Sequence, residues 1–254
     1  MRTNVRAFME IAAESFAPDG PVYEFGSYLV EGQAGRGDLR RLFPGRKFIG
    51  CDMRAGPGVD RVCDLACLDL PNECAQTVLC LDTLEHVFEC RRAVEEMIRI
   101  LAPGGMLLIS APMDFRIHDY PSDYWRITPS CLSRLLAPLD ATLVGSQGLE
   151  SYPHTVFGIG CKTPVSSRFA RGANRFLEGF QHWLDAEQSR RTWQTRFKQW
   201  TIGRLRSKGE RRRLANFHQS RFALHLPARS WASARLKDSS VGLPARTGTR
   251  LDVI

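Results

Sequence analysis

Three short apolar runs in the first quarter of the chain end in an acidic residue or a glycine. Glu24 lies in the first run, which is followed by Gly26 and Ser27. The second run ends at Asp52 and the third at Asp64. Such runs are typical of buried strands in parallel sheets, and open α/β sheets bind ligands outside the carboxyl ends of their strands. Acids and a sterically permissive glycine at that edge predict a site for a polyhydroxylated, cationic ligand.

A second group of reactive side chains lies in residues 112–128, a long aromatic and charged segment. His118 is the candidate base, because an unperturbed imidazole pKa of about 6.5 suits proton removal from a hydroxyl. Arg126 would hold an anionic acceptor, and Tyr124 and Trp125 would stack on a ring. The alternatives are a histidine that only packs the loop and aromatic residues that form a lid without touching a substrate.

Five motifs follow one another in an order that resembles the class I S-adenosyl-L-methionine-dependent methyltransferases, in particular the type 11-like group. They are E-x-G-S at 24–27, IGCD at 49–52, CDL at 63–65, LCLDTLEHV at 79–87 and LAPGGMLLIS at 101–110. The likeness covers roughly residues 22–162. It implies an S-adenosyl-L-methionine cofactor and methyl transfer to a small-molecule or saccharide acceptor, at oxygen, with no metal.

The resemblance also implies a role for each strand-end residue. Asp52 would accept hydrogen bonds from the ribose diol, and Asp64 with Leu65 would meet the adenine edge. Glu24, Gly26 and Ser27 would form the first loop beside the methionine end of the cofactor. Each acid has an alternative as a turn, cap or salt-bridge residue.

The segment after the fourth strand would wall the cofactor and face the acceptor. Asp82 would line the site there. Glu85 and His86 are as consistent with structural residues at a helix start.

The first loop departs from the family. Bulky residues stand at 28–30 where further glycines are usual, and Asp52 lies farther from Glu24 than the ~20 residues common in dinucleotide folds. The route of the chain between these two acids must therefore be longer.

The alternation of strand and helix patterns indicates parallel βαβ units and an α/β fold. Strands are expected at 22–25, 47–52, 59–64, 77–81 and 106–110, and helices at 38–43, 90–101 and 129–136. The resemblance implies a Rossmann-like methyltransferase fold. Its mostly parallel, seven-stranded sheet has helices on both faces and is closed by an antiparallel pair at 141–145 and 155–161. A basic helical C-terminal extension would follow.

Charge divides the chain in two. Residues 1–161 hold 15 Lys/Arg and 21 Asp/Glu, whereas residues 162–254 hold 20 and 6, so the formal charges are −6 and +14. We therefore expect four parts: an N-terminal amphipathic helix at 1–20, the methyltransferase domain at 21–162, a basic aromatic helical extension at 163–219, and a disordered tail at 220–254.

The eight cysteines form no CxxC pair, which favours reduced, mostly buried thiols in a cytoplasmic protein. No apolar stretch approaches the ~20 residues of a membrane span, and the N-terminal segment carries acids, unlike a signal peptide.

Two other functions stay open. The fold could bind NAD, although the G-x-G-x-x-G fingerprint is absent. Alternatively, the protein is non-catalytic and uses residues 165–215, where basic residues alternate with Phe and Trp, to bind nucleic acid or an anionic membrane surface. The third interpretation of this segment is a helix that packs its aromatic stripe on the domain or on a second subunit.

Overall fold

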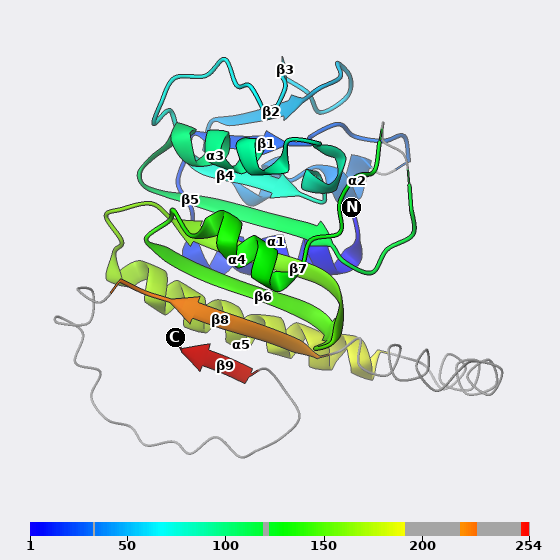
Figure 1. The fold of residues 1–254 in the computed structure, drawn as a ribbon, viewed down its shortest axis with the longest axis vertical. Helices are drawn as coiled ribbons and strands as arrows, with labels where there is room; N and C mark the ends of the chain where they lie inside the picture. Colours follow the sequence, from blue (N-terminus) through cyan, green and yellow to red (C-terminus); the bar gives the residue numbers. More distant parts are fainter. Residues whose placement is uncertain (33, 119–121, 191–218, 228–249, 254) are drawn as a thin grey trace.

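A nine-stranded mixed sheet forms the centre of the protein in the computed structural model, which describes residues 1–32, 34–118, 122–190, 219–227 and 250–253 (Figure 1). The strand order is β3-β2-β1-β4-β5-β7-β6-β8-β9. The strands are β1 (Val22–Phe25), β2 (Phe48–Asp52), β3 (Arg61–Val62), β4 (Ala75–Leu81), β5 (Leu101–Pro112), β6 (Ala141–Leu149), β7 (Tyr152–Cys161), β8 (Ser220–His225) and β9 (Arg250–Val253).

The first five strands pair in parallel, and β7 then runs antiparallel to both β5 and β6. This arrangement confirms the predicted parallel sheet closed by an antiparallel pair. Strands β8 and β9 extend it beyond the seven strands that the resemblance implied, with β8 antiparallel to β6.

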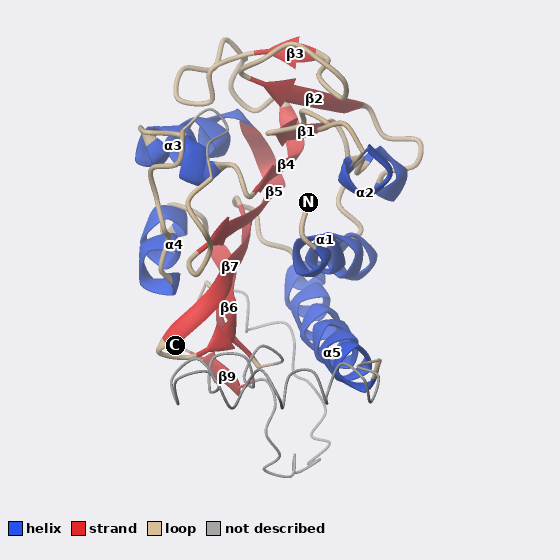
Figure 2. Cartoon of the chain, turned by 90° about the vertical axis from the view of Figure 1, so that its right-hand side faces the viewer, coloured by secondary structure: helices blue, strands red, loops and turns tan. Residues whose placement is uncertain are grey.

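Helices cover both faces of the sheet, as predicted (Figure 2). One face carries α1 (Thr3–Phe16), α2 (Ala34–Gly37) and α5 (Ser167–Ser189), and the other carries α3 (Cys90–Ile100) and α4 (Pro129–Leu136). Two short 3-10 turns, η1 (Arg40–Leu42) and η2 (Leu84–His86), complete the described helical elements.

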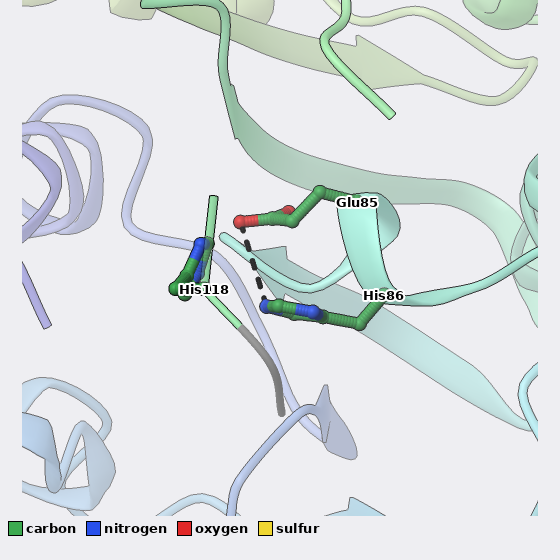
Figure 3. Close-up of side chains that lie close together, drawn as sticks. All are labelled: Glu85, His86 and His118. Carbon is green, nitrogen blue, oxygen red and sulfur yellow. Dashed lines mark ion pairs between the residues drawn. The ribbon is translucent and has the colours of Figure 1, made fainter. Parts of the chain in front are cut away.

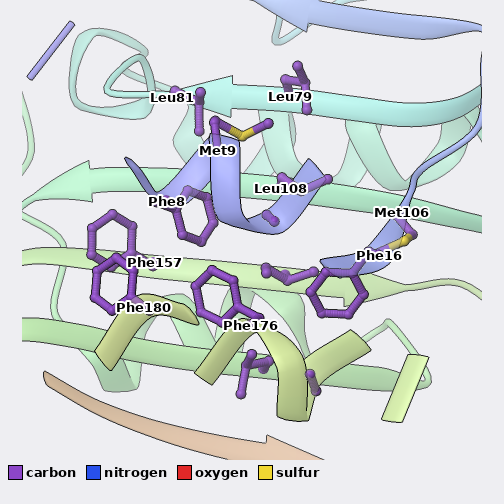
Figure 4. Close-up of a cluster of buried hydrophobic side chains, with 14 of the residues drawn as sticks. Phe8, Met9, Phe16, Leu79, Leu81, Met106, Leu108, Phe157, Phe176 and Phe180 are labelled. Atoms are coloured by element: carbon purple, nitrogen blue, oxygen red, sulfur yellow. The ribbon is translucent and has the colours of Figure 1, made fainter. Parts of the chain in front are cut away.

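Two hydrophobic cores result from the period-two alternation of the strands. In β4, Leu79 and Leu81 face the core under α1 and α5, whereas Val78 and Cys80 face the core under α3 and α4. Figure 4 shows the first core, in which phenylalanines of α1, β7 and α5 meet.

The aromatic stripe of α5 is buried in that core. Phe176 and Phe180 stack with ring centroids 5.5 Å apart, and Phe8 of α1 meets Phe176 edge to face at 5.6 Å. The packing interpretation of the extension is therefore confirmed for α5. The rest of the predicted basic segment, residues 191–218, lies outside the described residues.

Three local predictions need correction. The disordered tail expected from residue 220 contains strand β8 and, at its end, strand β9. The helix expected at 38–43 is only the single turn η1, because Pro44 and Gly45 follow at once. The strand expected at 106–110 begins earlier, at Leu101, and its register against β4 shifts between Ala75 and Thr77.

No helix in the described part of the chain is both long and apolar enough to cross a membrane.

Candidate functional site

A pocket of about 800 Å³ lies at the carboxyl ends of β1, β2, β4 and β5, the edge at which the sequence predicted a site. The segments that follow all five parallel strands, β1 to β5, line it, together with the first two residues of the chain. Its size is in the upper part of the ~300–1,000 Å³ range of ligand pockets.

Gly26 makes the turn that opens this pocket. Its φ of +85° is in the left-handed region, and a Cβ there would lie 2.1 Å from the hydroxyl oxygen of Thr83. Thr83 in turn donates hydrogen bonds to the carbonyls of Phe25 and Leu81. The glycine therefore lets the end of β1 lie directly against the end of β4.

Asp52 projects from the end of β2 beside the first loop. Its carboxylate accepts hydrogen bonds from the backbone N–H groups of Tyr28 (3.3 Å) and Arg54 (3.1 Å). The Arg54 guanidinium lies 4.6 Å from the centroid of the Tyr28 ring. Asp52 thus joins the first loop to the end of β2, and Tyr28 fills space where the family usually has glycine.

Ser27 is the neighbouring polar group. Its hydroxyl oxygen is buried and has no hydrogen-bond partner among the described residues. Buried polar atoms are normally paired, so this hydroxyl is available to a ligand in the pocket that it lines.

Asp64 and Leu65 follow β3 and line the same pocket. One carboxylate oxygen of Asp64 accepts the backbone N–H of Ala66 at 2.8 Å, which closes a local turn. Leu65 is buried in the core under α3 and α4. The pair presents an acid and an apolar surface side by side.

Glu24 is almost fully buried at the end of β1. Burial raises the pKa of Glu24 to about 8, although the positive charge of Arg40 partly opposes the shift. A cation bound in the pocket would favour the ionised carboxylate.

Asp82 stands in the pocket wall with its carboxylate already paired. The guanidinium of Arg2 binds it in a bidentate manner at 2.6 and 2.8 Å, and the Ser110 hydroxyl donates to it at 3.0 Å. Arg2 also donates to Thr155 at 2.9 Å. The N-terminus is thereby anchored over the pocket, a contact between distant residues that sequence analysis missed.

Asp123 and Arg126 hold the segment after β5 in place. Both guanidinium ends of Arg126 bind the Asp123 carboxylate, at 2.5 and 2.8 Å, and hold the pKa of Asp123 well below its usual range. The remaining donors of Arg126 bind the carbonyls of Phe115, Arg116 and Trp125.

The structure uses the donors of Arg126 within its own loop and does not place it in the pocket lining, so its role with an anionic acceptor stays a prediction. Trp125 does not line the pocket either. Its indole N–H donates to the carbonyls of Val87 and Phe88, and its ring lies beside Phe88 at the rim.

His118 faces the pocket, where it meets Glu85 and His86 of η2 (Figure 3). The His86 and His118 rings pack edge to face with centroids 4.8 Å apart. Glu85 is almost completely buried, and this burial raises its pKa well above the ordinary value. The sequence left Glu85 and His86 undecided between structural and functional roles.

The structure brings most of the predicted site residues together. All of the predicted cofactor residues line the pocket with His118 and Tyr124: Glu24, Gly26, Ser27, Asp52, Asp64, Leu65 and Asp82.

Residues 41–109 match the family model described as "Methyltransferase domain". This segment runs from η1 to β5 and supplies the ends of β2, β3 and β4 to the pocket. Residues 41–109 of this chain are therefore similar to a methyltransferase domain. The match covers the IGCD, CDL and LCLDTLEHV motifs on which the resemblance was recognised.

Several solved structures of S-adenosylmethionine-dependent methyltransferases are similar in fold to this chain. One is a possible histamine N-methyltransferase from Thermotoga maritima, 18% identical, with a TM-score of 0.46 over 63% of this chain and 92% of the other. Another is the 1,6-didemethyltoxoflavin-N1-methyltransferase of Burkholderia thailandensis, solved with S-adenosylhomocysteine, 19% identical, with a TM-score of 0.49 over 63% and 79%. Likenesses this distant carry no argument about the site. No protein of curated function matches the chain significantly.

The residues at the strand ends fit the cofactor. The pocket offers hydrogen-bond acceptors to the ribose diol and to the cationic amino acid end of the cofactor. They are the acid at the tip of β2, the buried hydroxyl of Ser27, which has no partner among the described residues, and the buried acid Glu24. Gly26 has a left-handed backbone conformation and no Cβ, so the backbone between Glu24 and Ser27 can lie directly against Thr83 at the pocket.

Proposed function

We propose that this protein is an S-adenosylmethionine-dependent methyltransferase that acts on an oxygen of a small-molecule or saccharide acceptor. The observation that carries the proposal is the polar wall of Glu85, His86 and His118 beside the aromatic rings of Phe88 and Tyr124. Hydroxyl acceptors need a group that takes up a proton, and sugar or phenolic rings pack well against aromatic side chains.

The cofactor supplies a methyl group on a positively charged sulfur, which makes that carbon electrophilic. We assign Asp52 to the ribose diol, Asp64 and Leu65 to the adenine edge, and Glu24, Gly26 and Ser27 to the methionine end. Asp82 contributes to the pocket wall as the anchor of Arg2 rather than as a free acceptor.

His118 is the residue that we propose activates the acceptor oxygen. Its Nδ1 lies 3.1 Å from Asp123, so the N–H donates to the carboxylate and leaves the lone pair on Nε2. As a general base, Nε2 would take the hydroxyl proton while the oxygen bonds to the methyl carbon and the carbon–sulfur bond breaks, with its electron pair kept by sulfur.

The test of the cofactor is calorimetric titration with S-adenosylmethionine and S-adenosylhomocysteine, with NAD as the control. Micromolar binding of the first two and none of NAD supports the proposal. Acceptors that bear hydroxyls, beginning with sugars and lipid-linked glycans, are then screened by mass spectrometry for a gain of one methyl group. Methylation confined to amine acceptors would contradict the assignment to oxygen.

His118→Ala is expected to lower turnover by about 10²–10⁴-fold, the usual contribution of a positioned base. Affinity for S-adenosylhomocysteine should change little, because His118 lies on the acceptor side. His182→Ala, on the exposed surface of α5, is the matched control. Unchanged turnover in His118→Ala would exclude the role in activation.

A further inference from the structure

Glu85, His86 and His118 form a cluster whose ligand atoms all lie within 4.8 Å of one another (Figure 3). Glu85 and His86 are neighbours in η2, and His118 comes from the segment after β5. A carboxylate and two imidazoles converge on one point in the wall of the pocket, a donor set that is used for metal ions.

Both imidazoles are oriented by acceptors on their far side. His86 Nδ1 lies 2.6 Å from the carbonyl of Ser122, and His118 Nδ1 lies 3.1 Å from the Asp123 carboxylate. A carbonyl only accepts, so Nδ1 of His86 carries the proton and Nε2 carries the lone pair. This is the arrangement in which outer partners fix the tautomer of metal-binding histidines.

The carboxylate of Glu85 is paired at one oxygen only, where Oε1 lies 3.9 Å from Nε2 of His86. Glu85 is 1% exposed, and its Oε2 has no hydrogen-bond partner among the described residues. The nearby charges are paired with each other, Asp82 with Arg2 and Asp123 with Arg126. A buried carboxylate oxygen without a partner is costly, and a cation between the carboxylate and the two imidazoles would offset that cost.

The spacing is close to that of a bound ion. Two ligands at ~2.1 Å from one Zn²⁺ are at most about 4.2 Å apart. Glu85 Oε1 and His86 Nε2 are 3.9 Å apart, within that limit. The ligand atoms of all three residues lie within 4.8 Å of one another, so a shift of His118 by less than about 1 Å brings the third ligand into range.

We propose that Glu85, His86 and His118 bind a divalent transition-metal ion such as Zn²⁺. Two nitrogens and one oxygen favour such an ion over Mg²⁺ or Ca²⁺, which prefer oxygen ligands. The resemblance implied no metal, and only the tertiary structure brings η2 to the segment after β5.

The proposed ion deepens the proposed function and rests on it for its role. Three protein ligands leave a position open toward the pocket, where an acceptor hydroxyl binds. The ion lowers the pKa of that hydroxyl, whose proton passes to water. The oxygen then bonds to the methyl carbon, and the electron pair of the broken carbon–sulfur bond stays on sulfur. His118 acts in this case as a ligand and not as the base.

The test begins with the full-length protein, stripped with EDTA and titrated with Zn²⁺ in a calorimeter and with Co²⁺ in a visible spectrophotometer. One ion per chain with micromolar or tighter affinity, and visible Co²⁺ bands, support the site. Glu85→Gln, His86→Asn and His118→Asn should each weaken Zn²⁺ binding by more than ~10-fold. His182→Asn, a surface histidine on α5, should bind like the wild type.

Absence of stoichiometric binding, or equal affinity in the three cluster variants and the wild type, would overturn the proposal. Titration of every variant with S-adenosylhomocysteine shows whether it is folded and also separates the two claims. Zn²⁺ binding without S-adenosylhomocysteine binding leaves the metal site standing and defeats the proposed function. S-adenosylhomocysteine binding without Zn²⁺ binding defeats the metal site and leaves the proposed function standing. Methylation that is equally fast in the stripped protein would overturn the role of the ion.

Discussion

At the scale of the residue, three acids at strand ends differ through their surroundings. Glu24 is buried and its pKa rises to about 8, whereas Asp52 is held by two backbone N–H groups at the pocket edge. Asp82 is occupied by Arg2. Three carboxylates that look alike in sequence are thus a buried acid, a proposed acceptor for the cofactor and an anchor for the N-terminal segment.

Asp52→Ala is expected to weaken S-adenosylhomocysteine binding by at least tenfold. Hydrogen bonds to a charged group contribute ~1.5–3 kcal/mol each, and 1.4 kcal/mol is tenfold in affinity. Calorimetry measures the change. Asp69→Ala, an exposed acid outside the pocket, is the control. Equal affinities of the two variants would remove Asp52 from the cofactor site.

Glu24→Gln should remove a pH dependence of stability. A carboxyl whose pKa is raised in the folded state binds a proton that the unfolded chain has lost, so the wild type loses stability between about pH 4.5 and 8. The free energy of unfolding of the wild type relative to Glu24→Gln should fall by up to ~1.4 kcal/mol per pH unit in that window. Denaturant titrations of both proteins at pH 5, 6.5 and 8 measure these free energies. The same pH dependence in the wild type and in Glu24→Gln would contradict the raised pKa of Glu24.

At the scale of the element, η2 and the segment after β5 form one unit. The backbone N–H groups of Tyr124 and Trp125 both donate to the carbonyl of Glu85, at 2.7 and 3.3 Å. His86 adds the contact to Ser122. These bonds hold the acceptor side of the pocket together and explain how His118 comes to face η2.

The contact of α1 with α5 depends on a small residue. A Cβ at Gly172 would lie 2.5 Å from the buried ring of Phe16. Gly172→Val is therefore expected to lower the free energy of unfolding by about 1–3 kcal/mol, the usual effect of overpacking. Asn174→Val, on the exposed side of the same helix, should stay within ~0.5 kcal/mol. Denaturant titration compares the two, and equal effects would contradict the packing described.

At the scale of the molecule, the basic C-terminal half is tied to the acidic domain through apolar contacts. Phe222 of β8 lies edge to face with Phe176 (5.4 Å) and Phe180 (5.6 Å), and it occupies the space left by Gly145 of β6. Strand β8 therefore seals the core between the sheet and α5 and also covers the edge of β6.

Phe222→Ala should destabilise the whole protein by about 3–5 kcal/mol, because a buried ring is removed from a core that cannot fully collapse. His225→Ala changes an exposed position on the same strand and serves as the control. Thermal unfolding followed by circular dichroism measures both. A single unfolding transition whose midpoint falls only in Phe222→Ala indicates that β8 unfolds together with the core. An unchanged midpoint would mean that β8 does not contribute to the stability of the core.

The sequence by itself indicated the strands from β1 to β7, the acids at their ends and the order of the motifs, because period-two burial and strand-end chemistry are local features of the chain. Only the tertiary structure decided what each side chain meets. It paired Asp82 with Arg2, used up the donors of Arg126 within its own loop, and brought His118 to Glu85 and His86. Contacts between residues far apart in the chain depend on how the elements pack, and no local pattern records them.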